Sequence, residues 1–419
     1  MTPQRSRRIR LNQDPVYRRR RLVAGLLSAA LVVALLASIV AAWRSASTSA
    51  RTAASSVTAT LPVTATPGET APPTEQATPT PTEASPTASP TPAHREPITI
   101  TFAGDVHFED QVRANLTNPS ANLPALRDVL SASTFTMANL ETALTERGTP
   151  IAGKTYTFRA APSALTFLKD LGVDAVSMAN NHAADFGSVG LQDTLAAKAS
   201  GVLPIVGLGT NIEDALTPLT VDIGGVRTAI FATSDLNDET SSQFSATATR
   251  PGIVSTNGTA GAAALAAAVT RAKADHELVI VFPHWGTETQ TCPNDSQRRN
   301  AKALAAAGAD IVVGGHAHRV QGSGWSGTTF VGYGLGNFIW YNNRGSSADT
   351  GVLTITVEPD VLAKRAAGET TGSPVVAETW TPMLIQRDGI PVAATGSAGR
   401  LMTAKQAANT CSGLAQQAP

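Results

Sequence analysis

The chain has 419 residues, with 32 Lys and Arg against 32 Asp and Glu, so its formal net charge is zero. A balanced total gives no reason to expect nucleic acid as a partner, and we predict none. The balance hides an asymmetry, because residues 1–21 are strongly basic and include the run Arg18 to Arg21.

An apolar run without a charged residue follows the basic segment, from Leu22 to Trp43. As a helix it would be about 33 Å long, which is enough to cross the hydrocarbon core of a bilayer. Arginines beside such helices stay in the cytoplasm, so we predict a single-pass cell-membrane protein with 1–21 inside and the folded domain outside. A buried core helix and a signal peptide cut near 45–47 are the alternatives. The length of the run favours an uncleaved anchor.

Residues 44–96 consist mainly of Thr, Pro, Ala and Ser, as in TPTPTEASPTASPTP. A segment of this composition has too few apolar side chains to form a core. We therefore predict a disordered linker that separates the anchor 22–43 from the domain.

Both cysteines, Cys292 and Cys411, lie on the expected outer side of the membrane, where disulfides form. A bridge between them would tie the C-terminal tail, predicted as 395–419, to the domain. Two free thiols are the alternative.

Strand-like and helix-like segments alternate from residue 97 to about residue 394, which predicts one layered α/β domain. The expected strands are 98–103, 134–138, 175–178, 226–232, 278–282, 311–313 and 328–333, and the expected helices are 163–171, 189–199, 260–274 and 296–307.

Acids, amides and imidazoles follow five of the expected strands. They are Asp105 and His107, Glu141, Asn181 and His182, His284, and His316 and His318. Ligands bind at the carboxyl ends of the strands in open α/β sheets, so we expect these side chains to converge.

The last strand carries the clearest pattern, DIVVGGHAHR, in which His316 and His318 are two positions apart and can point to the same side. Neutral imidazoles are common ligands of transition metals. Together, the seven donors Asp105, His107, Glu141, Asn181, His284, His316 and His318 predict a site for two divalent ions with a bridging carboxylate. Such a pair activates water and stabilises a developing oxyanion. Scattered core and surface residues are the alternative.

Six motifs in order, FAGDVH, MANLET, MANNHAADFG, PHWGTE, GGHAH and GLGNF, make residues 98–340 resemble the CapA family of capsule and poly-γ-glutamate synthesis proteins. These proteins are relatives of the calcineurin-like metallophosphoesterases. The resemblance implies a four-layer α/β/β/α sandwich with the metal site at the sheet edges. A membrane anchor before an external domain is also the family's usual arrangement.

The resemblance assigns each ligand a place. Asp105 and His107 would hold the first ion, Glu141 would bridge, Asn181, His284 and His316 would hold the second, and His318 would return to the first. The ions would be Mn, Fe, Zn or Mg.

The resemblance also implies roles around the ions. His182 would be a general acid or substrate contact, with a ring that merely caps the turn as the alternative. Asp185 would orient His182 or its loop, and Gly187 would allow the turn. Glu288 would either support the ligands or bind substrate, and Asn337 would fix a loop. The family often has histidine and proline where this chain has Gly315 and Ala317, but neither position is an expected ligand.

Two functions follow, and both stay open at this point. The first is a component of envelope-polymer synthesis or export that binds an anionic polymer such as poly-γ-glutamate and works beside membrane proteins of capsule synthesis. The second is a metal-dependent hydrolase that cleaves a phosphoester or an amide of an envelope polymer. A purely adhesive domain would require the donor cluster to be accidental. Metal ligands alone do not establish turnover.

Overall fold

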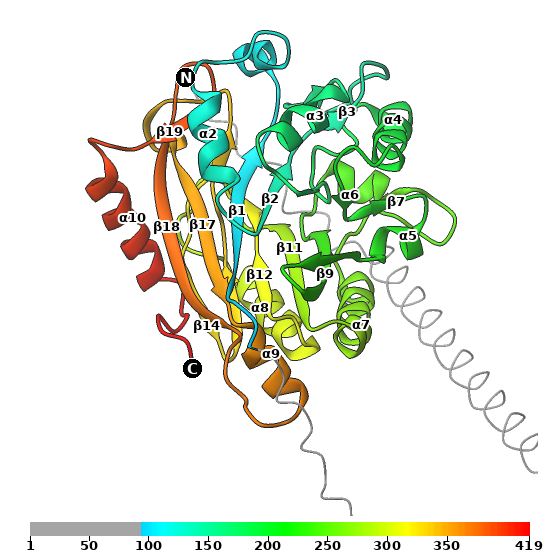
Figure 1. Cartoon of the computed structure of the whole chain (residues 1–419). Helices are drawn as coiled ribbons and strands as arrows, with labels where there is room; N and C mark the ends of the chain where they lie inside the picture. Colours follow the sequence, from blue (N-terminus) through cyan, green and yellow to red (C-terminus); the bar gives the residue numbers. More distant parts are fainter. Residues whose placement is uncertain (1–93) are drawn as a thin grey trace, which may run out of the picture. The chain divides into compact units, whose positions relative to one another are not determined.

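The computed structural model describes residues 94–419 (Figure 1). The predicted basic tail 1–21, the anchor 22–43 and nearly all of the linker 44–96 lie outside the described residues. Within residues 94–419, no helix is both long enough and apolar enough to span a bilayer.

Eight strands form the first sheet, in the order β19 (Pro391–Ala393), β18 (Val375–Ile385), β17 (Asp349–Val357), β1 (Ile98–Val106), β2 (Phe135–Leu140), β5 (Ala175–Ser177) and β6 (Ile205–Val206), with β16 (Asn337–Ile339) also paired to β1. Strands β1, β2, β5 and β6 are parallel, whereas β17, β18 and β19 are antiparallel. The parallel half therefore brings several strand ends to one edge.

Seven strands form the second sheet, in the order β14 (Ser323–Ser326), β15 (Thr329–Gly332), β12 (Ile311–Val313), β11 (Leu278–Trp285), β9 (Val226–Ser234) and β8 (Leu219–Ile223), with β13 (Gly315–His316) paired to β11. Its central strands are parallel and its edge strands antiparallel. Every residue of β11 and β12 is buried, as expected for parallel strands covered on both faces. Two short pairs complete the strands, β3 (Ala143–Leu144) with β4 (Arg159–Ala160) and β7 (Leu208–Gly209) with β10 (Gly252–Ile253).

The helices are α2 (Leu123–Leu130), α3 (Ser163–Asp170), α4 (Gly187–Ala199), α5 (Ile212–Leu216), α6 (Glu239–Phe244), α7 (Thr259–Asp275), α8 (Asp295–Ala307), α9 (Pro359–Ala366) and α10 (Ala398–Thr410), with 3-10 turns η1 (Asp110–Leu116) and η2 (Gly345–Ser347). Helices α2 and α10 lie along the β17–β18 side of the first sheet, and α7 lies beside the second sheet (Figure 1).

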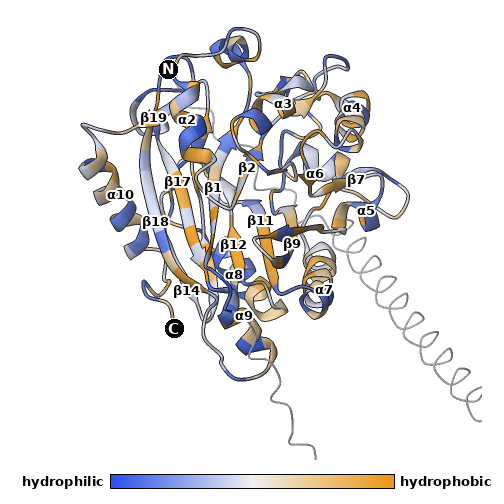
Figure 2. Ribbon diagram, in the orientation of Figure 1, coloured by the Kyte–Doolittle hydropathy of each residue, from blue (hydrophilic) through white to orange (hydrophobic). Residues whose placement is uncertain are grey.

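Alternation along the strands shows how the two sheets meet. Ile280 and Phe282 of β11 share the main core with Phe102 of β1, whereas Val279 and Val281 pack with the apolar residues of α7 and α8. The two sheets thus share one core, and helices cover the far side of the second sheet. Figure 2 shows strands β11, β12 and β17 as hydrophobic bands inside a more polar outer shell.

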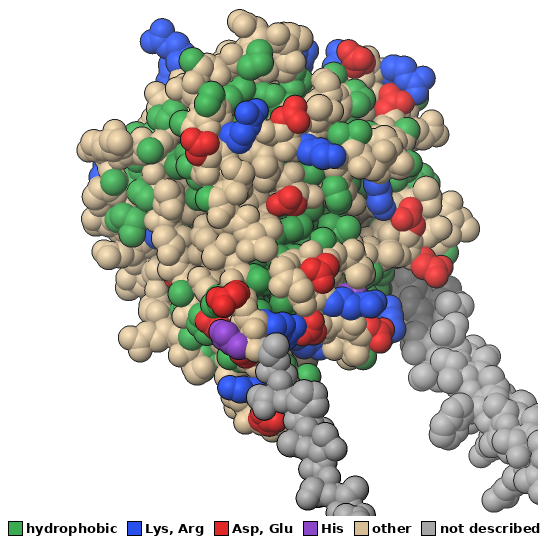
Figure 3. Space-filling view, in the orientation of Figure 1, with side chains coloured by type: hydrophobic (Ala, Val, Ile, Leu, Met, Phe, Trp, Pro, Cys, Tyr) green, Lys and Arg blue, Asp and Glu red, His purple; other side chains and the backbone are tan. Residues whose placement is uncertain are grey.

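The predicted α/β fold is confirmed, and each expected strand and helix is present with ends shifted by no more than three residues. The largest difference is at the ends of β1 and β11, which run on to Val106 and Trp285. These extensions carry Asp105 and His284, and the pairing of β1 with β2 and β16 shifts register at Asp105. On the face shown in Figure 3, acidic and basic side chains are interspersed, in keeping with the balanced charge.

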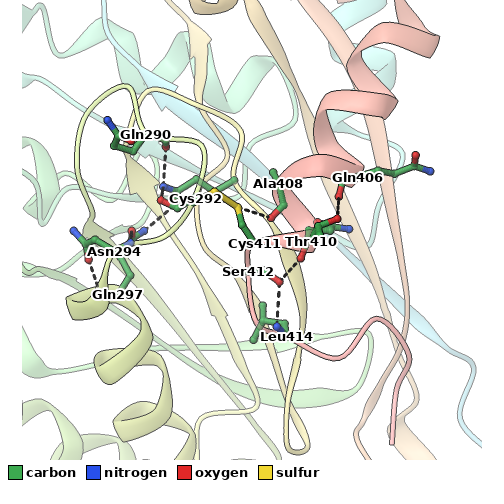
Figure 4. The surroundings of a disulfide bond; sticks show 12 residues. Gln290, Cys292, Asn294, Gln297, Gln406, Ala408, Thr410, Cys411, Ser412 and Leu414 are labelled. Carbon is green, nitrogen blue, oxygen red and sulfur yellow. Dashed lines mark hydrogen bonds between the residues drawn. A yellow bond between two sulfur atoms is a disulfide. The ribbon is translucent and has the colours of Figure 1, made fainter.

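Both ends of the described chain are fastened to the domain. His94 contacts Asp360 at 2.5 Å, and the Arg95 guanidinium pairs with Glu277 at 2.7 Å. At the other end, the predicted tail contains α10, and a disulfide joins Cys411 to Cys292, as the compartment argument predicted (Figure 4).

Candidate metal centre

The predicted donors gather where strands of both sheets end. Asp105 lies near the end of β1, Glu141 directly follows β2, His284 lies in β11, and His316 is the last residue of β13. Each is reached by a short buried segment rather than a long loop, which holds the donors in place.

Three overlapping groups of side chains could each hold a cation. In every group the ligand atoms lie within 4.8 Å of one another, and the groups are Glu141, His284 and His316; Asp105, Glu141 and His318; and Glu288, His316 and His318. Glu141, His316 and His318 each belong to two groups. The structure therefore brings five of the seven predicted ligands together and adds Glu288.

Glu141 is the central donor. It is fully buried, and its Oε1 lies 3.4 Å from Nε2 of His284 and 3.9 Å from Nε2 of His318. Neither of its carboxylate oxygens has a hydrogen-bond partner within residues 94–419, and the same holds for Nδ1 of His316. A buried carboxylate without partners costs several kcal/mol unless a cation or proton neutralises it. The residues present therefore fit a bound metal.

Asn181 and His107 differ in how they relate to these groups. Nε2 of His284 contacts Oδ1 of Asn181 at 2.9 Å, so the Asn181 amide oxygen lies beside the Glu141 group. His107 lies in none of the three groups. Its Nδ1 accepts a hydrogen bond from the backbone N–H of Glu109, and its ring lies 4.0 Å from Trp340, centre to centre. The ligand role of His107 stays a prediction.

Two asparagines that the sequence analysis did not assign to the site hold it together. Asn139 Nδ2 donates to Oδ1 of Asp105 at 2.9 Å and contacts Nδ1 of His284 at 3.1 Å. Asn180 Nδ2 in turn donates to Oδ1 of Asn139. The signal was present, because residues two apart at a strand end share a side, so Asn139 accompanies Glu141.

The loop that carries His316 and His318 has an unusual backbone. Both residues have positive φ, 90° and 50°, in a region that residues other than glycine rarely occupy. Such strain is found at functional sites, where the surroundings enforce it. Gly315 lies between the strand and this turn, and a Cβ there would fall 2.3 Å from Oδ1 of Asp105. Gly315 is one of the two positions where this chain differs from the usual family motif, and its lack of a side chain makes room for the Asp105 carboxylate.

The titratable side chains of the centre have pKa values shifted in opposite directions. Burial raises the pKa of Glu141 well above its usual value, and the neighbouring Asp105 raises it further. Burial alone would lower the pKa of His318, but Glu141 and Asp105 raise it to about 9. Burial lowers the pKa of His284 to about 4 and that of His316 well below its usual value. Two imidazoles are thus neutral and ready to bind a cation, whereas His318 carries a proton.

We expect divalent-metal affinity to rise with pH, because a cation must displace the proton of His318. Below a pH of about 9 this proton is present and opposes binding, so affinity should fall by at least about tenfold for each pH unit from there down. Calorimetric titration of the full chain with Mn²⁺ at several pH values measures this slope. A His94→Ala variant, changed outside the centre, should keep the slope, and a flat profile would contradict the assignment of His318.

His182 and Asp185 form a pair at the border of the centre. Nδ1 of His182 contacts Oδ2 of Asp185 at 2.5 Å, and Nε2 lies 3.7 Å from Oε1 of Glu141. The ring stacks on Phe158 at 4.1 Å, centre to centre. The prediction that Asp185 orients His182 agrees with these contacts. Gly187 has a φ of 68°, as its predicted turn requires, and Asn337 fixes a loop by donating to the carbonyl of Ser347.

Lys154 is a buried cation that sequence reasoning missed. Its Nζ pairs with Oδ1 of Asp185 at 2.5 Å and donates to the backbone carbonyl of Asn181. Burial raises the pKa of Asp185 to about 7, against the lowering effect of Lys154. Nothing in the isolated motif AGKTYTF marks its lysine as buried.

A pocket of about 310 Å³ opens from the centre to solvent, and Lys154, His182, Glu288 and His316 line it. Glu288 is exposed at this rim and also belongs to a cation group, so both of its predicted roles remain compatible with its place. Its loop is fixed, because the backbone N–H of Thr289 donates to the carbonyl of Ala317. Cys292 ends the same loop and is bound to Cys411 (Figure 4).

The fold and the site define an α/β protein with a buried acid–imidazole centre at the strand ends of two sheets. Residues 99–342 match the family described as "Bacterial capsule synthesis protein PGA_cap". The chain belongs to this family, and the CapA resemblance is confirmed.

Curated relatives carry similar names. The chain is 28% identical over 297 residues to the PGA biosynthesis protein CapA of Bacillus subtilis, covering 70% of this chain and 75% of the relative. It is 29% identical over 284 residues to the capsule biosynthesis protein CapA of Bacillus anthracis, covering 64% and 68%. A probable polyglutamine synthesis accessory protein of Mycobacterium tuberculosis is 31% identical over 45% of this chain and 50% of its own.

Among solved structures, a phosphatase from Mycoplasma pneumoniae has a TM-score of 0.42 at 13% identity, covering 74% of this chain and 97% of its own. A hypothetical protein from Thermus thermophilus has a TM-score of 0.35 at 19% identity, covering 71% and 96%. Both TM-scores are below 0.5, and the family assignment rests on the sequence matches.

Proposed function

We propose that the chain is a metal-dependent component of capsule or poly-γ-glutamate synthesis or export, held on the outer side of the cell membrane by its N-terminal segment. The family and the names of the Bacillus relatives support the process. The basic and apolar segments 1–21 and 22–43 support the location. Its partners would be the bilayer, an anionic polymer or phosphoester, and membrane proteins of capsule synthesis.

The observation that carries the proposal is the buried Glu141 carboxylate among the three imidazoles of His284, His316 and His318. Its place in two groups supports a dinuclear centre. The two sheets with a shared core and helices outside support a four-layer sandwich of the metallophosphoesterase type. The donors are oxygen and nitrogen without thiolate, which suits Mn, Fe, Zn or Mg.

In this proposal Asp105 and His318 would hold one ion, Asn181, His284 and His316 would hold the other, and Glu141 would serve both. Bound ions would supply an activated water and stabilise negative charge on the reacting group.

The chain's own groups position the substrate and move protons. Asp185 holds Nδ1 of His182, which leaves Nε2 directed to the centre for proton transfer at a leaving group. Lys154 contributes positive charge at the base of the open pocket.

The second candidate is a hydrolase that cleaves a phosphoester or an amide of an envelope polymer, independently of capsule synthesis. The His182–Asp185 pair favours it, because a binding pocket alone has no need of an oriented imidazole beside the donors.

Metal analysis and a generic phosphoester assay on the purified full chain test the proposal against this second candidate. We expect His316→Ala to lose metal, and His182→Ala to keep it. Any turnover should fall in both variants, by about 10²- to 10⁴-fold in His182→Ala.

Metal-dependent binding of poly-γ-glutamate without turnover would favour the synthesis component. Turnover in the wild type without polymer binding would favour the independent hydrolase. A wild-type chain that binds no divalent metal would contradict both.

A further inference from the structure

A second, larger pocket lies beside the metal centre. It has a volume of about 1040 Å³ and is lined by residues 341–344, residues 385–387 and Gln111. We call it the arginine pocket, because Arg344 and Arg387 both line it. No Asp or Glu is among its lining residues in the described part of the chain.

Both arginines are free to bind a ligand. Their side chains are exposed, and neither guanidinium makes an ion pair or a hydrogen bond to another residue of the segment 94–419. Arg147 and Arg400, by contrast, pair with Asp193 and Asp349. Two uncompensated guanidinium groups in one pocket favour an anion with more than one charge.

The acid next to Arg387 along the chain is hydrogen-bonded to groups outside the arginine pocket. Asp388 follows Arg387, but its Oδ2 accepts hydrogen bonds from the Ser120 hydroxyl and from Asn122. Its Oδ1 accepts from the backbone N–H of Ile390 at 3.0 Å. The Asp388 carboxylate is thus bonded to the loop before α2, and the lining of the arginine pocket carries two arginines and no acid.

The other lining groups are neutral amides that fix the pocket's walls. Nδ2 of Asn343 donates to the carbonyl of Gln386 at 3.0 Å, which joins the two wall segments. Nε2 of Gln111 donates to the carbonyl of Tyr341 at 2.6 Å. These bonds hold the walls in place, so a ligand would meet a preformed pocket.

Aromatic side chains join the arginine pocket to the metal centre. The Tyr341 ring lines the pocket and lies 4.8 Å from the ring of His107, centre to centre. Trp340, its neighbour in sequence, lies 4.7 Å from the ring of His318. Tyr341 and Trp340 therefore lie between the arginine pocket and the imidazoles of His107 and His318.

We propose that the arginine pocket binds a segment of an extended polycarboxylate chain, with Arg344 and Arg387 contacting its carboxylates while another unit lies at the metal centre. This inference rests on the proposed function, because it takes the polymer to be the ligand. The pocket's size suits several units of such a chain better than a single small anion.

Binding of a fluorescent γ-linked glutamate oligomer to the full chain, followed by anisotropy, tests the inference. The double variant Arg344→Gln, Arg387→Gln loses two exposed charge pairs, so it should bind the oligomer about tenfold more weakly. Metal content should not change. Arg271→Gln is the matched control, because Arg271 is exposed on α7 and does not line the arginine pocket.

Chelator-treated protein separates this inference from the proposed function. The weakening in the double variant should persist without metal, even if the metal-dependent part of binding proves to be absent. Unchanged oligomer affinity in the double variant would overturn the arginine pocket and leave the metal centre standing. Arginine-dependent binding of polyphosphate in preference to the glutamate oligomer would also overturn the polycarboxylate assignment.

Discussion

Replacing Glu141 with Gln should abolish metal binding while leaving the metal-free fold at least as stable as the wild type. The carboxylate belongs to two cation groups, so its loss should weaken both by at least about 100-fold, a larger effect than loss of a supporting residue. Without metal, the Glu141 carboxylate has no hydrogen-bond partner within residues 94–419, and burial raises its pKa. A neutral amide of the same shape avoids the cost of burying that charge.

Metal analysis and thermal unfolding with and without chelator measure the two effects. Glu146→Gln, an exposed change five positions away, should alter neither. The wild type should lose stability on chelation and the Glu141→Gln variant should not. If Glu141→Gln retained metal, or if its metal-free form unfolded at a much lower temperature, Glu141 would be a structural residue and not the central ligand.

Removing the disulfide should produce the largest loss of stability. Cys292 and Cys411 are 119 positions apart, and closing a loop of that length in the unfolded chain corresponds to about 5 kcal/mol. The bridge also holds the end of α10 against the loop that carries Glu288. We therefore expect Cys411→Ala to lower the free energy of unfolding by about 2–5 kcal/mol.

Urea unfolding with and without a reducing agent tests this expectation. Reductant should move the wild-type midpoint toward that of the variant, and the variant itself should not respond to it. An equal response of the two proteins would show that reductant acts elsewhere. Unchanged stability in the variant would mean that the contacts of Arg298 with the carbonyls of Cys411 and Ser412 already fix this segment.

Strand ends were the most predictable part of the site. Short apolar runs followed by acids or imidazoles predicted that Asp105, Glu141, His284 and His316 would converge, because parallel strands bring their carboxyl ends together. In the structure these strand ends come from both sheets. The same runs predicted the α/β fold, because continuous β-branched apolar runs are typical of parallel strands that are buried on both faces.

Other features depended on tertiary contacts that no local pattern records. Lys154 lies in a loop, and only the fold buries it against Asp185. His107 follows a strand in the same way as the other donors, yet aromatic side chains from distant segments pack around its ring. Arg344 and Arg387 come from separate segments that meet only in the folded chain, so the sequence could not mark them as a pair.

Strand β1 connects the start of the described chain to the metal centre. The described chain begins at His94, where ion pairs clamp it at the amino end of β1, and Asp105 lies seven residues beyond Ile98 at the opposite end. A strand of that length spans about 23 Å. The length of β1 therefore separates the clamped start of the described chain from the Asp105 carboxylate of the metal centre.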